Sequence, residues 1–212
     1  MSASREIVDL ARKGETLKRL TRTGWALAGV DCVRPESVGE HTFGTALISS
    51  LIAKRCIDNG IHVDLGKVSM MAIIHDLVES RLSDIPRTAI ELGAERFQEG
   101  KDEAEKKAIQ QISEKSIHFG KWLIDLWNES LRMESMESRI VRGADIIDMI
   151  VHALSLEASG VSPKILDQFF VNSRSILEGI DLEIMEELFW DLYEEHISNA
   201  QHQGLELNRI TR

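Results

Sequence analysis

The chain has 212 residues, of which 43% are hydrophobic and 28% charged, and its formal net charge is −10. This composition is that of a globular protein, and the negative charge argues against general nucleic-acid binding, which needs a basic surface. No apolar run approaches the roughly 20 residues that span a bilayer, and the polar start of the chain lacks the apolar core of a signal peptide. Cys32 and Cys56 have neither disulfide-framework nor metal-site spacing. We therefore expect a cytoplasmic protein without nucleic-acid or membrane partners.

Hydrophobic residues recur at the helical period through most of the chain, and each of its three prolines precedes or opens a helical pattern. The sequence predicts an all-α, single-domain bundle. Helices are expected over 4–20, 36–57, a segment capped by Asp64 that carries "KVSMMAIIHDLVES", a weaker segment after "LSDIPR", the charged "ERFQEGKDEAEKKAIQQISEK", 118–132, 134–158, 163–178 and 181–199. We expect an irregular loop over 21–35 and fraying of the tail "NAQHQGLELNRITR".

Residues 1–34 carry seven basic and four acidic side chains. This local excess of positive charge could attract a small anion, or it could belong to a solvated helix face.

The segment "ADIIDMIVHALSL" is apolar nearly all round, which predicts a central helix. Asp145 and Asp148 nevertheless lie inside it, and His152 follows one turn later on the same face. A buried carboxylate must be paired, hydrogen-bonded or bound to a metal. Asp145 could pair with Arg142, whereas Asp148 and His152 either orient a neighbouring ligand or form a structural pair.

Two further histidines stand where helices should be buried. In "AIIHDLVES" an apolar run ends in His75 and Asp76, with Glu79 one turn later, and His41 lies on the inner stripe of the helix over 36–57. Each feature alone is compatible with a core histidine or a helix end at the surface. Together with Asp145 they form a mixed nitrogen and oxygen ligand set, which suits one divalent first-row metal such as Mn, Fe, Co, Ni or Zn. The absence of cysteine ligands argues for open coordination positions.

The order His, His-Asp, Asp on an all-helical chain resembles the HD-domain phosphohydrolases. The segments "LKRLTRTGWALAGVDCVRPESVGEHTF", "HDLVESRLSDIPR" and "LIDLWNESLRMESMESRIVRGADIIDMI" are similar to the 5′-deoxynucleotidase branch, the YfbR-type and HD-domain-containing-2-type enzymes. The likeness runs from about Leu17 to Leu156. It implies an HD core over residues 1–160, with the helices of 161–212 packed on the same domain, and a twofold homodimer.

The resemblance also implies roles for individual residues: metal ligands His41, His75, Asp76 and Asp145, catalytic Glu79 and Asp84, and substrate-binding Arg22 and Trp25. The bound metal would activate water for attack on phosphorus. Glu79 would orient or deprotonate that water, and Asp84 would protonate the leaving 5′-oxygen or hold the sugar. Arg22 would bind phosphate in a bidentate fork, and Trp25 would stack on the nucleoside or exclude a ribose 2′-hydroxyl. We therefore expect a phosphomonoesterase for deoxyribonucleoside 5′-monophosphates that uses Co, Mn or another first-row metal.

Two alternatives remain open at this point. One is another HD-type hydrolase, such as a cyclic-nucleotide or alarmone phosphodiesterase or a triphosphohydrolase, and those enzymes usually need more basic groups. The other is a helical sensor or interaction module without catalysis. Residues outside the site are expected to be exposed histidines (His62, His118, His196 and His202) and core or interface tryptophans (Trp122, Trp127 and Trp190).

Overall fold

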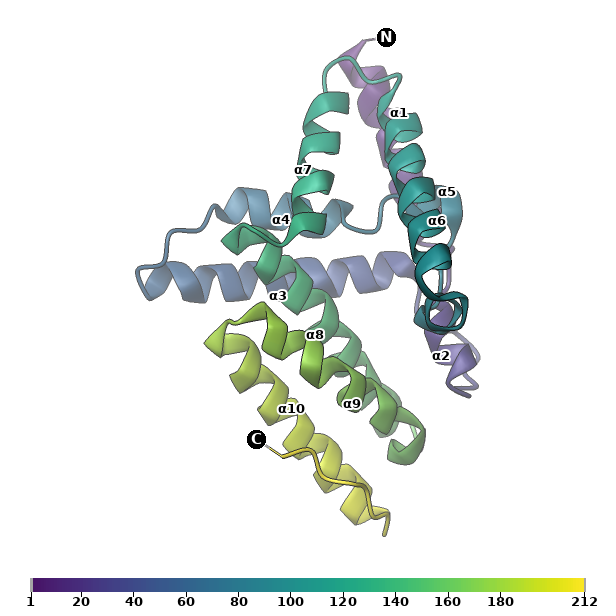
Figure 1. Cartoon of the computed structure of the whole chain (residues 1–212), viewed down its shortest axis with the longest axis vertical. Helices are drawn as coiled ribbons and strands as arrows, with labels where there is room; N and C mark the ends of the chain where they lie inside the picture. Colours follow the sequence, from purple (N-terminus) through teal and green to yellow (C-terminus); the bar gives the residue numbers. More distant parts are fainter. Residues whose placement is uncertain (1, 212) are drawn as a thin grey trace.

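The computed structural model describes residues 2–211, which form helices joined by turns and loops (Figure 1). The helices are α1 (Ala3–Leu17), α2 (Thr23–Leu27), α3 (Val38–Asp58), α4 (Leu65–Ile74), α5 (Glu79–Leu82), α6 (Arg87–Ser113), α7 (Gly120–Arg132), α8 (Met136–Ala158), α9 (Pro163–Ile180) and α10 (Glu183–His202). Within residues 2–211 there is no strand, only one isolated bridge between Thr21 and Ser37. The predicted all-α fold is confirmed. None of the helices in this part of the chain has the length and apolar character needed to cross a membrane.

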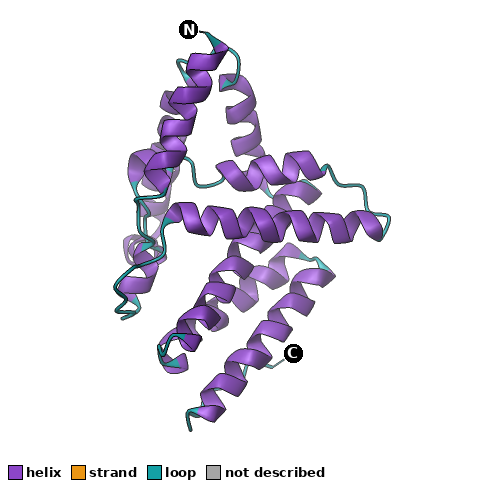
Figure 2. Cartoon of the chain, turned by 180° about the vertical axis from the view of Figure 1, so that it is seen from behind, coloured by secondary structure: helices purple, strands orange, loops and turns teal. Residues whose placement is uncertain are grey.

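The long helices α3 and α8 cross near the middle of the molecule and pack against each other (Figures 1 and 2). Helix α4 packs along α3 and against α8, whereas α9 and α10 pack on α8 from the other side. Helices α1, α6 and α7 lie on the side of α3 opposite to α10. The α3–α8 crossing therefore holds the rest of the bundle together.

The sequence of α8 explains its central place. Ile140, Ile147 and Ile150 are at most 2% exposed, and burying one large aliphatic side chain contributes about 1.5–3 kcal/mol. Gly143 admits Met185 of α10, because a Cβ at position 143 would lie 2.4 Å from the methionine Cε. A larger residue at position 143 would therefore require the flexible end of the Met185 side chain to shift.

Local capping sets the ends of the helices that flank the crossing. Ser37 and Glu40 form a reciprocal capping box at the start of α3, and Gly60, with φ +80°, follows its end. Asp64 caps α4 as expected, since its carboxylate accepts a hydrogen bond of 3.0 Å from the Lys67 backbone N–H.

The structure differs from the sequence prediction at several boundaries. Helix α4 ends at Ile74, so the expectation of one helix through Glu79 is wrong. Leu77 N–H donates to the Ile74 carbonyl and Glu79 N–H to the Asp76 carbonyl, both at 3.0 Å, and these i→i−3 bonds make a tighter turn. The expected loop over 21–35 contains the short helix α2, and α6 is broken at Ala94, with φ 53°.

His196 is fully buried, which corrects the expectation that it is exposed. Its Nδ1 lies 2.5 Å from Glu157 Oε1 on α8 and its Nε2 lies 3.2 Å from Asp167 Oδ1 on α9. Asn199 donates to the second oxygen of Glu157 at 2.7 Å. These polar side chains bond to one another between three helices, so they do not face solvent as a helix-by-helix reading of α10 suggests.

The segment after α10 turns back along that helix. Ile210 N–H donates to the Tyr193 hydroxyl at 2.8 Å, and Ile210 packs against the core. On α8, the Arg139 Nε–H donates to the Ile180 carbonyl at the end of α9 at 2.8 Å. The helices after residue 160 are thus packed on those before it, while the division of the chain at residue 160 stays a prediction.

Glu6 joins α1 to the turn between α6 and α7. Its side chain is 1% exposed and accepts from Ser116 Oγ at 2.7 Å and from His118 N–H at 3.0 Å. Burial alone would raise the pKa of Glu6, but these hydrogen bonds outweigh it and lower the pKa from 4.5 to about 2.

A pH-dependent stability difference follows. Because the pKa of Glu6 is lower in the folded than in the unfolded chain, its stabilisation is complete above about pH 4.5 and is lost as the pH falls toward 2. We expect Glu6→Gln to melt below wild type at pH 7, and the difference in Tm to shrink between pH 5 and 2. The exposed Glu103→Gln serves as control. A Tm difference independent of pH, measured by circular dichroism, would contradict this account.

Candidate metal centre

His41 lies at the α3–α8 crossing and is fully buried. Its Nδ1 is 2.8 Å from Asp148 Oδ2 and its Nε2 is 3.0 Å from Asp145 Oδ1. The two aspartates stand three residues apart on α8, which presents both carboxylates to the same face of α3. The shared helix face that the sequence indicated for Asp145 and Asp148 is thus confirmed.

Gly44 makes room for this arrangement one turn along α3. A Cβ at position 44 would lie 1.9 Å from Asp148 Oδ1, a separation that real atoms do not reach. Any larger residue would therefore displace the Asp148 carboxylate from His41. Sequence reasoning had not singled out this glycine.

His75 and Asp76 enter the site from the turn after α4. His75 Nδ1–H donates to the Ala72 carbonyl at 2.7 Å, which directs Nε2 toward the interior. That Nε2 lies 3.1 Å from Asp76 Oδ2, and Asp76 Oδ2 lies 3.8 Å from His41 Nε2. The four ligands expected from the sequence thus converge from α3, α8 and the turn between α4 and α5.

The residues fit a divalent metal ion. Donor atoms of His41, His75 and Asp145 lie within 4.8 Å of one another. His75 Nε2 and Asp76 Oδ2 make no hydrogen bond beyond their ion-pair contact, and Glu79 Oε2 is buried without a hydrogen-bond partner. Such burial is costly unless something binds these atoms. With both Nδ1 atoms held by Asp148 and by a backbone carbonyl, each histidine can present Nε2 as a ligand.

The pKa values describe the site without a cation. Burial and Arg22 lower the pKa of His41, but its hydrogen bonds to Asp145 and Asp148 outweigh them and raise it to about 10. Burial raises the pKa of Asp76, but His75, His41 and Arg22 together outweigh burial and lower it to about 2. Either a proton on His41 or a bound cation can thus neutralise the negative charge of the same carboxylates.

Glu79 begins α5 beside these ligands. Burial raises the pKa of Glu79 to about 9, and the nearby charges of Asp76 and Asp84 add to this effect. A carboxyl with a raised pKa beside a candidate metal site is typical of an acid–base catalyst.

Arg22 approaches from the segment before α2. Its Nη1 lies 3.6 Å from Asp76 Oδ2, and its side chain is 18% exposed. Asp84 fixes this segment, since its Oδ2 accepts from the Thr23 hydroxyl at 2.7 Å and from the Thr23 backbone N–H. Arg22 and Asp84 are thus both near the predicted ligands. Asp84 also fixes the backbone segment that carries Arg22.

Trp25, three residues after Arg22 in the chain, is 3% exposed. Its indole N–H donates to Glu36 Oε2 at 2.8 Å, and its ring lies 4.5 Å from Phe169 and 5.1 Å from His152, between centroids. The ring is therefore packed in the interior and is not free to stack on a ligand in this conformation. Sequence reasoning missed Glu36, because an acidic residue before a helix usually serves only as a cap.

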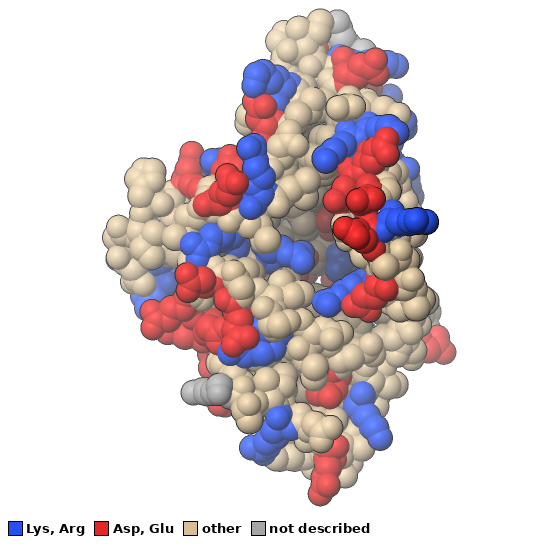
Figure 3. All heavy atoms as spheres, viewed as in Figure 1, with Lys and Arg blue, Asp and Glu red and all other residues tan. Residues whose placement is uncertain are grey.

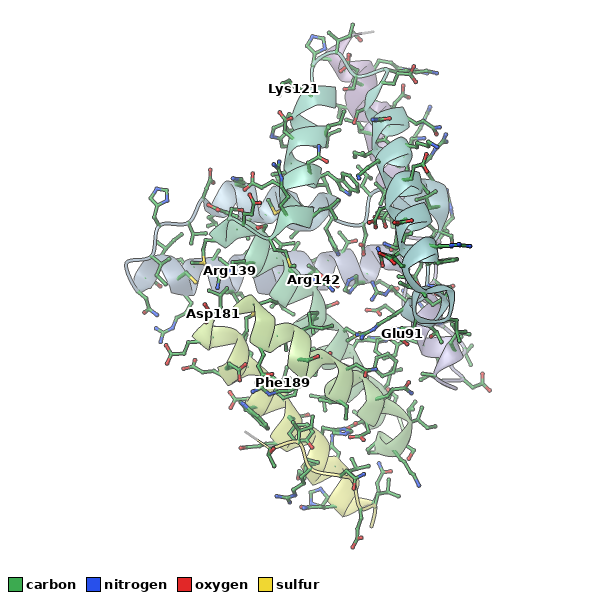
Figure 4. All side chains as sticks on the ribbon, in the orientation of Figure 1. Glu91, Lys121, Arg139, Arg142, Asp181 and Phe189 are labelled. Carbon is green, nitrogen blue, oxygen red and sulfur yellow. The ribbon has the colours of Figure 1, made fainter. Side chains whose placement is uncertain are left out.

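Arg142 closes the other edge of the site. Its Nη1 lies 2.7 Å from Asp145 Oδ2, so the pairing with Arg142 and the contact with His41 use different oxygens of one carboxylate. Figure 4 shows Arg142 projecting from α8 on the viewed face. The space-filling view shows this face hollowed between α6 and α8, with acidic side chains along the α6 rim (Figure 3).

Comparison with known proteins places this geometry in context. Residues 14–182 match the model of the HD domain. The 5′-deoxynucleotidase HDDC2 of Dictyostelium discoideum is 34% identical over 145 residues, covering 66% of this chain and 72% of the relative. The human 5′-deoxynucleotidase HDDC2 is 29% identical over 167 residues, covering 79% of this chain and 76% of the relative.

Solved structures share the fold. The PH0347 protein from Pyrococcus horikoshii OT3 superposes with a TM-score of 0.69 at 33% identity, covering 89% of this chain and 98% of that one. An HD-domain phosphohydrolase from Listeria innocua gives a TM-score of 0.76 at 16% identity, covering 95% of this chain and 94% of that one, which supports the fold alone.

The contact between Asp148 and His41 yields a prediction for metal affinity. Asp148→Ala should weaken Co²⁺ binding by about 10–100-fold, the usual effect of losing a group that orients a ligand. Asp148→Asn should weaken binding at least as much although it has the same size, because an amide that donates to Nδ1 moves the histidine proton to Nε2. Asp145→Ala, which removes a ligand, should cost more than either.

Titration of the chelator-treated protein with Co²⁺ measures all three variants, and the exposed Asp125→Asn is the matched control. Wild-type affinity in Asp148→Asn would show that Asp148 does not set the proton position of His41. Wild-type affinity in Asp145→Ala would remove Asp145 from the ligand set.

Proposed function

We propose that this chain, which belongs to the HD-domain family, is a metal-dependent 5′-nucleotidase that removes phosphate from deoxyribonucleoside 5′-monophosphates. The observation that carries the proposal is the convergence of two histidine Nε2 atoms and two aspartates beside a partly buried arginine. The similarity to relatives named 5′-deoxynucleotidases supports the choice of substrate.

The proposed cofactor is one divalent first-row ion, such as Co²⁺ or Mn²⁺, held by His41, His75, Asp76 and Asp145. When bound, such an ion lowers the pKa of water and screens phosphate charge. Arg22 binds the phosphate, since its planar guanidinium can donate two parallel hydrogen bonds to two oxygens. Its contact with Asp76 supports this role by placing the guanidinium next to the ligands.

Glu79 moves the protons of the reaction in this proposal. A cation held by the neighbouring ligands would lower the raised pKa of Glu79, because a nearby positive charge favours the ionised carboxylate. The buried Oε2 next to Asp76 could then hold the attacking water and accept its proton. Asp84 protonates the leaving 5′-oxygen or holds the sugar through the oxygen that does not bind Thr23. Trp25 forms the wall that excludes a ribose 2′-hydroxyl, a role that agrees with its rigid contacts to Glu36 and Phe169.

The charge of the site favours a monophosphate. Arg22 and Arg142 are the guanidinium groups paired with the site aspartates among the described residues. A triphosphate or an alarmone carries more negative charge and would call for more cations. A non-catalytic sensor would not need Glu79 beside intact ligands.

We also propose a cytoplasmic location and a homodimeric assembly. The location is supported by the unpaired Cys32 and Cys56, which suit a reducing compartment. Of the three tryptophans expected to contribute to a dimer, Trp127 and Trp190 are 1% and 9% exposed, whereas Trp122 is 44% exposed and lies at the surface. Further apolar area is exposed on the outer face of α3, where Phe43, Leu47 and Leu51 are 72%, 51% and 62% exposed.

Kinetics separates the roles of Glu79 and Arg22. Glu79→Gln keeps size and hydrogen bonding but removes basicity, so kcat should fall by roughly 10²–10⁴ while metal content is unchanged. Arg22→Ala should act mainly through phosphate binding and raise KM. Phosphate release is measured from deoxyribo- and ribonucleoside 5′-monophosphates, with triphosphates and a phosphodiester for comparison.

The exposed Glu91→Gln on α6 is the control. Near-normal kcat in Glu79→Gln with metal retained would remove Glu79 from the chemistry, and loss of metal would make it a ligand. Faster turnover of a diester or a triphosphate than of any monophosphate would overturn the proposed substrate class.

A further inference from the structure

Arg142 projects from α8 beside a candidate metal ligand on the same helix (Figure 4). Arg142 and Asp145 stand three residues apart, so their side chains are neighbours on one helix face. The Arg142 Nη1–H donates to Asp145 Oδ2 at 2.7 Å. The two side chains are 42% and 19% exposed. Because water screens such a pair, it adds little to the stability of the fold, and its effect is expected on the carboxylate that it holds.

The two oxygens of Asp145 have different partners. Oδ1 lies 3.0 Å from Nε2 of His41, the nitrogen that can face a metal, whereas Oδ2 accepts the hydrogen bond from Arg142. Burial would raise the pKa of Asp145, but His41 and Arg142 outweigh burial and hold the pKa below its ordinary value. Asp145 is thus an ionised carboxylate with one oxygen toward the candidate ligands and the other bound to an arginine.

Arg22, the other arginine of the site, has a different geometry. Its Nη1 lies 3.6 Å from Asp76 Oδ2, which is too long for a hydrogen bond. That same Asp76 oxygen lies 3.1 Å from His75 Nε2, so Arg22 stands beside an atom that faces a candidate ligand. Arg142 instead bonds the oxygen of Asp145 that is not bonded to His41. The two arginines therefore suit different roles.

The helix around Asp145 leaves the carboxylate little freedom except rotation of its own side chain. Ala144 is fully buried and Ile147 is 2% exposed, so the backbone is fixed by packing on both sides. The hydrogen bond from Arg142 restrains the remaining rotation. Without it, the Asp145 side chain could turn until both of its oxygens face the candidate ligands.

The rotation of Asp145 matters because a carboxylate can bind a cation through one oxygen or through both. Coordination by both oxygens uses a second position on the metal. Metal-assisted hydrolysis needs open positions for water and for substrate. Each second oxygen that binds would remove a position of this kind. An oxygen that already accepts a charge-assisted hydrogen bond is less available to the metal.

We propose that Arg142 is a positioning residue of the metal centre: it holds Oδ2 of Asp145, so that this carboxylate binds the metal through Oδ1 alone and a coordination position stays open. Arg142 acts through Asp145 and touches neither the metal nor the phosphate. The inference rests on the proposed metal centre and does not depend on which phosphate ester is hydrolysed.

The number of waters on a bound Mn²⁺ ion tests this role on the full chain. Each exchanging water on this paramagnetic ion increases the relaxation rate of the solvent protons, so the rate reports how many positions are open. Arg142→Ala should lose one metal-bound water relative to wild type, because Oδ2 of Asp145 takes its place. Its affinity for Mn²⁺ should not fall. Arg142→Lys, which keeps a charged donor, should recover at least part of the wild-type relaxation.

Arg12→Ala is the matched control. Arg12 forms an ion pair with Asp9 at the same spacing of three residues, on α1, and its side chain is 67% exposed. This variant should keep the wild-type number of bound waters. Loss of a positive charge near the metal would by itself raise the affinity for Mn²⁺, but it would not remove a water. The water count therefore separates the hydrogen bond of Arg142 from its charge, and thermal melting shows whether each variant is folded.

The outcomes also separate this inference from the proposed function. Equal water counts in wild type and Mn²⁺-loaded Arg142→Ala would overturn the role of Arg142 alone. Loss of Mn²⁺ from folded Arg142→Ala would overturn it as well, since Arg142 would then be needed for the ligand to bind at all. A wild type that binds no Mn²⁺ would overturn both the centre and the inference. The predicted loss of a water, without phosphate release from any nucleotide, would overturn the hydrolysis and support the role of Arg142.

Discussion

The hydrogen bond between His41 and Asp148 is the constraint on which the site depends. It crosses between the two central helices, and it exists because Gly44 leaves the space that the carboxylate occupies. A fully buried imidazole has no water to exchange protons with, so its hydrogen-bond partners decide which ring nitrogen is free. Asp148 binds Nδ1 and leaves Nε2 to face Asp145 and His75. The same contact between α3 and α8 thus contributes to the packing of the bundle and to the geometry that would hold a metal.

The rest of the centre brings more carboxyl groups than basic side chains into one small volume. Asp76, Asp145 and Glu79 are brought close to each other and to Arg22. Leaving a buried polar group without a hydrogen bond costs about 1–3 kcal/mol. Three side chains here carry such an atom, two of which, His75 Nε2 and Asp76 Oδ2, contact each other as an ion pair. A divalent cation would satisfy these atoms together. Burial of these polar atoms destabilises the empty site, and binding of a cation would offset that destabilisation.

Sequence patterns predicted the helices and grouped the four candidate ligands, because spacing shows which ionisable groups lie on apolar helix faces. Other features could not be read this way. The turn after Ile74 depends on how α4 packs, and the helical period alone does not reveal it. His196 looked exposed because its partners, Glu157 and Asp167, come from two other helices. Glu36 and Gly44 act through Trp25 and Asp148, which are distant in sequence, and only the folded chain shows those contacts.

The most direct test of the central claim is the nitrogen that each histidine offers to a metal. Long-range proton–nitrogen NMR of the chain loaded with Zn²⁺, a diamagnetic probe, reports the state of each imidazole nitrogen. The account predicts that His41 and His75 both bind through Nε2 and keep a proton on Nδ1. Metal bound at Nδ1 of either histidine, or Zn²⁺ binding that leaves both imidazole rings unchanged, would contradict it.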